Sequence, residues 1–226
     1  MFCPRLPSAT EILPLPATAN LEHDTALIRD TLKFLANSGR DILVLMHSYG
    51  GVVGTNALEN LLAAQRRSQG LFGGVKHIVY MAAFVQPAGT RLTDPFNGNP
   101  PPWLDEDTEK DIVHMQTPRH AFYGHIESDN EAQNWLDMTV MCPSSVLRDA
   151  QSYAPYEYVG HGLDATYLVC SRDKELNAQV QEGMATLLGP DRHMEHCDAG
   201  HCCMIGYGSV IADVMDRAWT RTFKKA

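Results

Sequence analysis

The sequence predicts a single α/β domain, in which a mostly parallel β-sheet is flanked by helices and a helical lid is inserted into the chain. Short apolar runs of strand length alternate with segments of helical periodicity, which is the pattern of successive βαβ crossovers. The 226 residues, 44% of them apolar and 20% charged, suit one globular domain with a sizeable core. We expect residues 1–86 and 165–226 to form the core and residues 87–164 to form the lid.

The first part of the core is predicted to alternate helix and strand. Asn20 has the character of an N-cap, and apolar residues follow it at helical spacing until Gly39. The run DILVLM, residues 41–46, predicts a short strand buried on both faces of the sheet. A helix is expected from about residue 51 to 67, and the run VKHIVYMAAF predicts a strand over residues 75–84.

The second part of the core repeats this order. The runs ATYLVC and HMEHC predict strands over residues 165–170 and 193–197. Between them, residues 176–189 have the pattern of a helix that ends near a glycine, and residues 209–223 predict a closing helix. Strands that alternate with helices in this way require right-handed crossovers and therefore a parallel sheet.

The segment between the two parts differs in composition. Residues 87–164 are rich in proline, aromatic and polar residues, and they contain no evident strand pattern. A segment of about 75 residues is too long for a loop in a compact fold. Helical fragments are expected around Ala121 and over residues 130–138. We therefore interpret the segment as a helical lid over the sheet.

Composition excludes several classes of partner. The net charge of −9 argues against nucleic acids and anionic membranes, both of which need clustered lysine and arginine. No apolar run approaches the roughly 18–20 residues that span a bilayer, and the opening MFCPRLPS lacks the core of a signal peptide. We therefore expect a cytoplasmic protein that acts on a small molecule. The scattered positions of the six cysteines favour free thiols over a disulfide framework.

Ser48 is the candidate nucleophile. It lies at a strand-to-helix junction in the string MHSYGG, a G-x-S-x-G elbow whose first glycine is replaced by Met46. Such a turn exposes the serine hydroxyl at the carboxyl end of the sheet, and the next helix points its N-terminal N–H groups toward it. Gly50 is expected to relieve crowding against the adjoining strand. The alternative is a helix N-cap, but a cap does not account for Tyr49-Gly50-Gly51.

Asp173 and His201 are the candidate acid and base. A nucleophilic serine needs a base, and the base needs a carboxylate that orients it. Asp173 and His201 each follow a predicted strand, so both lie at carboxyl strand ends, where open α/β sheets bind their ligands. Asp198 is nearer to His201 in sequence, but we expect it only to shape the turn. His47 is expected to pack or hydrogen-bond beneath the elbow.

The run HMEHCDAGHCC also suggests a metal site. Its possible ligands are His193, His196, Cys197, His201 and Cys202. Alternate side chains of a strand point to opposite faces, so His193 and His196 should diverge. Their spacing also matches no common zinc pattern. We therefore expect neither a metal nor a cofactor.

The chain resembles the lid-bearing α/β-hydrolases related to plant methylesterases and hydroxynitrile lyases, in particular their fungal and microbial branch. The resemblance rests on MHSYGGVVG, VYMAAFVQPAG, PPWL, TYLVCSRD and DAGH, and it runs from about Cys3 to the C-terminus. It implies that the nucleophile, acid and base of the family correspond to Ser48, Asp173 and His201. It also implies that the backbone N–H of Tyr49 is a donor of the oxyanion hole.

The resemblance has one large departure. The family normally opens with a strand, a loop carrying part of the oxyanion hole, a helix, and a second strand that ends in a string like APRLPS. Here CPRLPS begins at Cys3, so a strand beside residues 41–46 and one oxyanion donor are expected to be missing. An unpaired parallel strand invites pairing with another chain. We therefore expect a homodimer or a rearrangement of residues 1–20.

The leading hypothesis is a serine hydrolase that acts on a small to medium apolar ester, thioester or lactone. One alternative is a carbon–carbon lyase or cyclase of the same fold, and another is an impaired relative that only binds. Cys202 follows His201 where hydroxynitrile lyases typically have a lysine, which counts against cyanohydrin cleavage. Candidate substrate-binding residues in the lid are Trp103, Phe122, Tyr123 and Trp135, although such aromatics usually pack a core.

Overall fold

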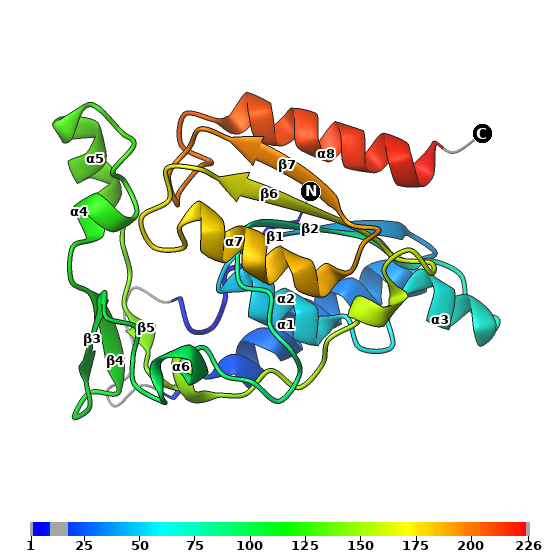
Figure 1. Ribbon diagram of the computed structural model, residues 1–226. Helices are drawn as coiled ribbons and strands as arrows, with labels where there is room; N and C mark the ends of the chain where they lie inside the picture. The colour runs from blue at the N-terminus through cyan, green and yellow to red at the C-terminus, as the bar shows by residue number, and fades with distance from the viewer. Residues whose placement is uncertain (1, 10–17, 225–226) are drawn as a thin grey trace.

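The central sheet confirms the predicted fold class. A computed structural model describes residues 2–9 and 18–224 of the chain. Four parallel strands form the sheet in the order β1-β2-β6-β7 (Figure 1). The strands are β1 (Asp41–Ser48), β2 (Gly74–Ala83), β6 (Asp164–Cys170) and β7 (His193–Cys197).

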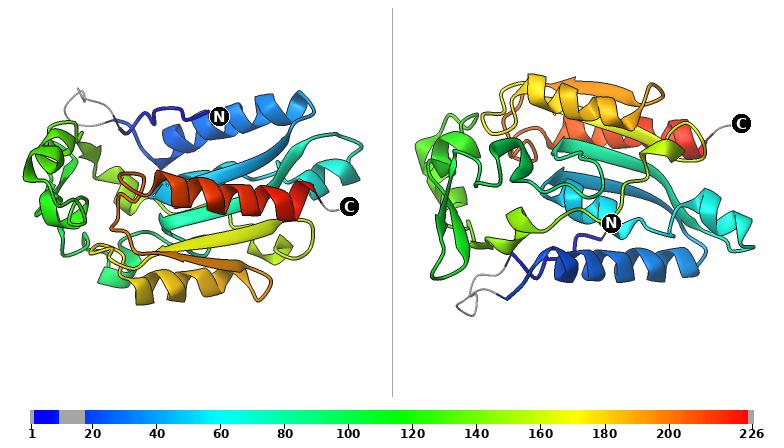
Figure 2. Two further views of the ribbon diagram at one scale, coloured as in Figure 1. Left: turned by 90° about the horizontal axis from the view of Figure 1, so that it is seen from above. Right: turned by 60° about the horizontal axis from the view of Figure 1, so that its bottom comes forward.

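Helices cover both faces of this sheet. The C-terminal helix α8 (Gly208–Phe223) packs on one face, against buried side chains of β2, β6 and β7. Three helices lie on the other face, namely α1 (Leu21–Asn37), α2 (Gly50–Ala57) and α7 (Ala178–Ala185), as the views in Figure 2 show. The result is the three-layer arrangement expected for a doubly covered parallel sheet.

The start of α1 follows the sequence prediction. Asn20 caps the helix, and its side-chain oxygen accepts a hydrogen bond of 3.1 Å from the backbone N–H of His23. At the other end, Gly39 has φ +76, a left-handed conformation that suits glycine and turns the chain into β1. No helix among the described residues combines the length and the apolar character that crossing a membrane requires.

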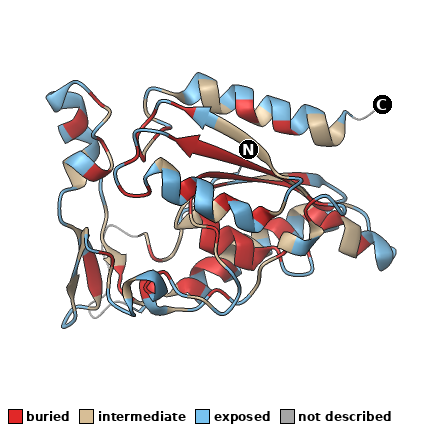
Figure 3. Ribbon diagram, viewed as in Figure 1, coloured by how far each residue is buried: buried red, intermediate tan, exposed pale blue. Residues whose placement is uncertain are grey.

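Burial is concentrated in β2 and β6, as Figure 3 shows. Strand β1 is different, and the expectation that it is buried on both faces is wrong. It is an edge strand, because no described residue pairs with it on the side away from β2, and Leu45 keeps 37% of its surface exposed. Residues 1 and 10–17, nine of the twenty residues expected to rearrange there, lie outside the described residues.

The helix expected over residues 51–67 is two helices. Helix α2 ends at Ala57, and α3 (Ala63–Ser68) begins after a turn in which Asn60 has φ +62. Leu62 is fully buried at the start of α3 and forms a parallel bridge with Val75 of β2. Burying Leu62 against the sheet therefore outweighs the continuation of one helix.

The segment between β2 and β6 contains strands that we did not predict. Strands β3 (Leu104–Asp107), β4 (Ile112–Met115) and β5 (Cys142–Pro143) form a small antiparallel sheet. The helices expected nearby are α4 (Pro118–Ala121) and α5 (Asp129–Leu136), and α6 (Ser145–Arg148) follows. The interpretation as a purely helical lid is thus wrong. Four-residue strands, one of them acidic, have too little alternation to be recognised.

The inserted segment is closed at its root by Gln151. The backbone N–H of Gly89 donates to the carbonyl of Gln151 at 2.7 Å, and the N–H of Gln151 donates to the carbonyl of Thr90 at 2.8 Å. The side chain of Gln151 is fully buried and donates to the carbonyls of Gln86 and Tyr153, both at 2.9 Å. The segment stands at the carboxyl ends of the parallel strands (Figure 1).

Candidate active site

Ser48 occupies a strained elbow at the end of β1. Its φ of +53 is unusual for a residue other than glycine, and such strain persists only where the surroundings impose it. The glycine that permits the close approach is Gly51, where an added Cβ would lie 2.2 Å from the carbonyl oxygen of Phe84. A Cβ on Gly50 would meet nothing within 4 Å, so our assignment of the crowded position to Gly50 is wrong.

Met46 replaces the first glycine of the elbow motif without a clash. Its side chain is buried against α2 at Gly54, where an added Cβ would lie 2.4 Å from the Met46 sulfur. A small residue on the helix thus makes room for a large residue on the strand. This exchange keeps the elbow intact although the motif itself departs from G-x-S-x-G.

The structure brings Ser48, His201 and Asp173 into one hydrogen-bonded chain. Ser48 Oγ lies 2.9 Å from His201 Nε2, and His201 Nδ1 lies 2.8 Å from Asp173 Oδ2. Because a carboxylate only accepts, Nδ1 carries the proton and Nε2 is free to accept the serine hydroxyl. Both His201 and Asp173 are buried, each 3% exposed. The arrangement is that of a nucleophile, a base and an orienting acid.

The loop after β6 holds Asp173 in place. The backbone N–H groups of Glu175 and Leu176 donate to Asp173 Oδ1 at 2.8 and 3.0 Å. The rival acid Asp198 does not bond His201; it lies against Ser171 and Arg172 and is largely exposed. Asp173, and not Asp198, is therefore the carboxylate that contacts His201.

His47 supports the base from behind, in agreement with its expected place beneath the elbow. Its Nε2–H donates to the backbone carbonyl of His201 at 2.8 Å, and the two rings lie 4.9 Å apart. Loss of hydration lowers the pKa of His47 well below its usual value, and the nearby His201 lowers it further. A neutral His47 thus fixes the main chain that carries the base.

Tyr49 connects the elbow to the N-terminal segment. It caps α2, so its own N–H belongs to the first turn, whose donors have no partner within the helix. Its hydroxyl donates to the buried Asp24 at 3.1 Å. Asp24 also accepts from the N–H and the hydroxyl of Ser8, at 2.9 and 2.6 Å. Burial and the charge of Asp24 raise the pKa of Tyr49 well above its usual value.

Among the four aromatic residues predicted to bind substrate, Phe122 lies against the triad. Its ring stacks on that of His201 at 5.6 Å, and its carbonyl accepts from the N–H of Cys202 at 3.3 Å. Trp103 packs edge-on against Phe96, and Tyr123 is buried within the insertion with its hydroxyl near the carbonyl of Trp135. The structure thus groups Phe122 with the triad and leaves the other three within the insertion.

Glu175 is a site residue that the sequence reasoning missed. It follows Asp173 by two positions, is 9% exposed, and its Oε2 is buried without a hydrogen-bond partner. Burial raises its pKa to about 7; the nearby His201 opposes this rise and Asp173 adds to it. A glutamate in a turn after a strand carries no sequence signal of burial.

The run HMEHCDAGHCC does not form a metal site. Within the described part of the chain, no three histidine, cysteine or acidic side chains are grouped as metal ligands. All six cysteines are free thiols, and Cys170 and Cys197 face each other at the ends of β6 and β7 with their sulfurs 3.5 Å apart.

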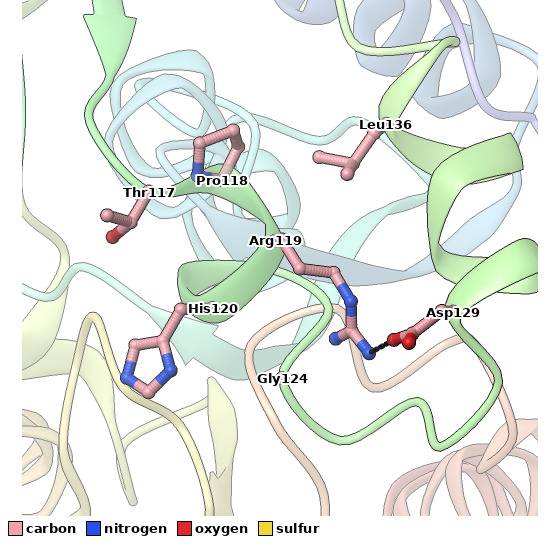
Figure 4. A pocket seen from close by; sticks show the side chains of 7 residues that line it. All are labelled: Thr117, Pro118, Arg119, His120, Gly124, Asp129 and Leu136. Carbon is pink, nitrogen blue, oxygen red and sulfur yellow. Dashed lines mark hydrogen bonds and ion pairs between the residues drawn. The ribbon is translucent and has the colours of Figure 1, made fainter.

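A hollow lies in the insertion, between α4 and α5. It is lined by residues of α4, α5 and the turn between them, and Figure 4 shows Arg119 reaching toward Asp129 across it. The Arg119 guanidinium also donates to the carbonyls of Tyr123 and Ile126. Three of its five N–H donors are bonded in this way, so Arg119 links α4 to the following turn and to α5.

Comparison with known proteins gives consistent matches. A model described as the alpha/beta hydrolase family matches residues 2–214. "Probable hydrolase R7" from a Phoma species is 26% identical over 216 residues, which are 93% of this chain and 83% of the relative. "Alpha/beta hydrolase nvfD" from Aspergillus novofumigatus is 22% identical over 217 residues, covering 94% of this chain and 82% of the relative.

Solved structures share the fold. A pyrethroid hydrolase from Sphingobium faniae has a TM-score of 0.65 at 17% identity, covering 99% of this chain and 87% of its own. Polyneuridine aldehyde esterase has a TM-score of 0.64 at 14% identity, covering 88% of this chain and 79% of its own.

Proposed function

Because this chain belongs to the alpha/beta hydrolase family, as its resemblance predicted, and is an ester-hydrolase-like enzyme, we propose that it cleaves an ester, thioester or lactone through Ser48, His201 and Asp173. The observation that carries the proposal is the distance of 2.9 Å between Ser48 Oγ and His201 Nε2, with Asp173 on the other side of the imidazole. That order of contacts is what acyl transfer to a serine requires.

The first half of the reaction acylates Ser48. Its Oγ attacks the carbonyl carbon while its proton passes to His201 Nε2, and Asp173 stabilises the imidazolium that forms. The backbone N–H of Tyr49 donates to the developing oxyanion. The intermediate then collapses, and His201 gives the proton to the departing alcohol or thiol. A water molecule activated by the same base releases the acid.

The insertion supplies part of the substrate site. Phe122 stacks on His201 and presents an apolar ring beside the reacting groups. This contact favours a small to medium apolar substrate, which an aromatic side chain helps to bury. Trp103, Tyr123 and Trp135 are proposed to contact only substrates large enough to reach into the insertion.

Labelling with a fluorophosphonate probe tests the nucleophile. We expect covalent labelling of the wild-type protein, and loss of labelling in Ser48→Ala and in His201→Ala. Ser68→Ala, which changes an exposed serine at the end of α3, is the control and should label normally. Labelling that survives Ser48→Ala would refute the proposal, and absence of labelling in the folded wild type would favour a relative that only binds.

A second assay separates ester hydrolysis from carbon–carbon cleavage. Cyanohydrin cleavage calls for a fixed positive charge beside the base, and the residue after His201 is the neutral Cys202, whose pKa burial raises to about 12. We expect hydrolysis of short aryl esters and no cyanide release from mandelonitrile, with Ser48→Ala as the blank. Cyanide release with the esters untouched would replace the hydrolase with a lyase.

A further inference from the structure

Two thiols face each other where the loops of the acid and the base begin, and the proposed reaction uses neither. Cys170 ends β6 and Cys197 ends β7, and the two residues are direct partners in the parallel ladder of these strands. Their sulfurs lie 3.5 Å apart, close enough for one S–H to donate to the other sulfur. Both side chains belong to one buried apolar cluster under α8. The sheet itself therefore brings the two sulfurs into contact.

The two thiols differ in exposure and in reactivity. Cys170 is fully buried, whereas Cys197 ends a strand at the edge of the described sheet and keeps 8% of its surface exposed. A hydrogen bond from the S–H of Cys170 lowers the pKa of Cys197, burial opposes this, and the N–H of Ala199 lowers the pKa further. The same sulfur contact raises the pKa of Cys170. Because the thiolate is the nucleophile, Cys197 is the attacking thiol and Cys170 is the thiol that completes the bond.

Short loops connect this pair to the acid and the base. Cys170 precedes Asp173 by three residues. Cys197 precedes His201 by four residues. The buried amide of Gln181 accepts from the N–H of Cys170 at 3.0 Å, and its Nε2 donates to the carbonyl of Cys170 at 3.1 Å and to Asp173 Oδ2 at 3.4 Å. A displacement of Cys170 is therefore passed to the carboxylate that contacts the base.

We propose that Cys170 and Cys197 form an oxidation site, at which hydrogen peroxide converts the two thiols into a disulfide that slows the reaction of Ser48. The effect on Ser48 rests on the proposed function, whereas the disulfide does not. The Cys197 thiolate attacks a peroxide oxygen, so the O–O bond breaks and a sulfenic acid forms. The Cys170 sulfur then attacks the sulfenic sulfur, the S–O bond breaks and the S–S bond forms. The pair loses two electrons and two protons, and the peroxide leaves as two molecules of water.

Formation of this bond moves the ends of β6 and β7. Neighbouring strands lie about 4.8 Å apart, and aligned side chains of a parallel pair leave their strands in the same direction. The Cβ atoms of a disulfide are only about 3.8 Å apart, so the two strand ends must approach by about 1 Å. A misplacement of about 1 Å can cost an enzyme about 10²-fold in rate. A strained disulfide is also readily reduced, so the effect is reversible.

Peptide mapping tests the bond. The reduced wild-type protein is treated with a small excess of hydrogen peroxide, alkylated, digested without reductant and sequenced by tandem mass spectrometry. We expect a cross-link between Cys170 and Cys197, and none in Cys170→Ala or Cys197→Ala. Cys203→Ala removes a buried thiol of the same apolar cluster and is the matched control, so it should form the cross-link as the wild type does.

Kinetics on the same samples test the effect on the triad. Oxidation of the wild type should lower kcat for para-nitrophenyl butyrate, and the rate at which a fluorophosphonate labels Ser48, by about tenfold or more. Dithiothreitol should restore both. Cys197→Ala should keep its activity under peroxide. Dithiothreitol does not reduce methionine sulfoxide, so recovery separates the disulfide from methionine oxidation.

Three results would overturn the proposal: no cross-link between Cys170 and Cys197 in the folded wild type, full activity of the cross-linked protein, or a reversible loss of activity that persists in Cys197→Ala. Failure of the proposed function is distinct, because then the reduced wild type neither cleaves the ester nor becomes labelled at Ser48. Peptide mapping still decides in that case whether the two thiols are an oxidation site, and the effect on Ser48 falls with the proposed function.

Discussion

Glu175 makes the stability of the fold depend on pH. Its pKa rises from 4.5 to about 7 on folding, so between these values the folded protein holds a proton that the unfolded chain has released. Stability therefore falls as pH rises from 4.5 to 7 and stays lower above that range. Glu175→Gln removes this loss. The full rise in pKa corresponds to about 3.4 kcal/mol, and solvent screening reduces it, so we expect the variant to be more stable than the wild type by about 2 kcal/mol at pH 8 and equal to it at pH 4.

Urea denaturation at several pH values measures this difference. Glu182→Gln, at an exposed position on α7, is the control. It should change the free energy of unfolding only slightly, and by the same amount at every pH. A stability difference between Glu175→Gln and the wild type that is constant from pH 4 to pH 8 would contradict the assignment, because the effect would then not come from ionisation of Glu175.

At the scale of residues, the sequence predicts the triad but not its surroundings. Ser48, Asp173 and His201 could be assigned because each follows a strand, and strand ends converge at one edge of a parallel sheet. The catalytic role itself awaits the labelling experiment. Glu175 could not be found, since its burial depends on how the turn before α7 packs. The sequence pointed to Gly50 and not Gly51 as the crowded glycine, because the direction in which each Cα faces depends on how α2 packs against Phe84.

At the scale of elements, the junction of β1 and α2 depends on Gly51. A Cβ there would lie 2.2 Å from a backbone oxygen of the neighbouring strand end, and backbone cannot move aside as a side chain can. Gly51→Ala should therefore unfold the elbow or destabilise the protein by about 3 kcal/mol, with loss of fluorophosphonate labelling. Thermal unfolding and labelling measure both effects.

Gly50 offers the matched control one position earlier. A Cβ at Gly50 would meet nothing within 4 Å, and its φ is not positive. Gly50→Ala should leave stability unchanged or raise it by about 0.5 kcal/mol, because alanine restricts the unfolded chain. If Gly50→Ala and Gly51→Ala change the stability equally, then Gly51 is not needed for the close approach of α2 to β2.

Prediction of the elements succeeded where they are long or capped. Helices α1 and α8 and the parallel strands have enough apolar periodicity to be recognised from the sequence. The break between α2 and α3 was missed because it depends on burying Leu62 against the sheet. The strands of the insertion were missed because each has only two to four residues, too few to show a clear alternation.

At the scale of the whole molecule, the exposed edge of β1 predicts self-association. The strand is paired only with β2 among the described residues, and Leu45 projects from it into solvent. We expect light scattering to find a dimer of twice the 25.0 kDa chain mass at micromolar concentration. Leu45→Lys should shift the protein toward monomer, because a charge on an edge strand opposes pairing.

Leu187 provides the comparison for Leu45. It is exposed to a similar degree, 39% against 37%, but lies beside α7 and not on a sheet edge. Leu187→Lys should leave the mass measured by light scattering unchanged from that of the wild-type dimer. A monomer at every concentration, or an equal effect of the two substitutions, would show that β1 is not the interface.

The hydrogen bonds of Gln151 at the root of the insertion have a consequence for how the substrate range of such a protein could change. The insertion leaves the core after β2 and returns before β6, which are neighbouring strands, and its root is closed by hydrogen bonds that do not involve its interior. Ser48, Asp173 and His201 all lie outside it. The insertion is therefore a cassette with fixed joints at Gly89 and Gln151. Grafting another sequence between these joints would replace the residues that contact the triad, Phe122 among them, while Ser48, Asp173 and His201 stay part of the core.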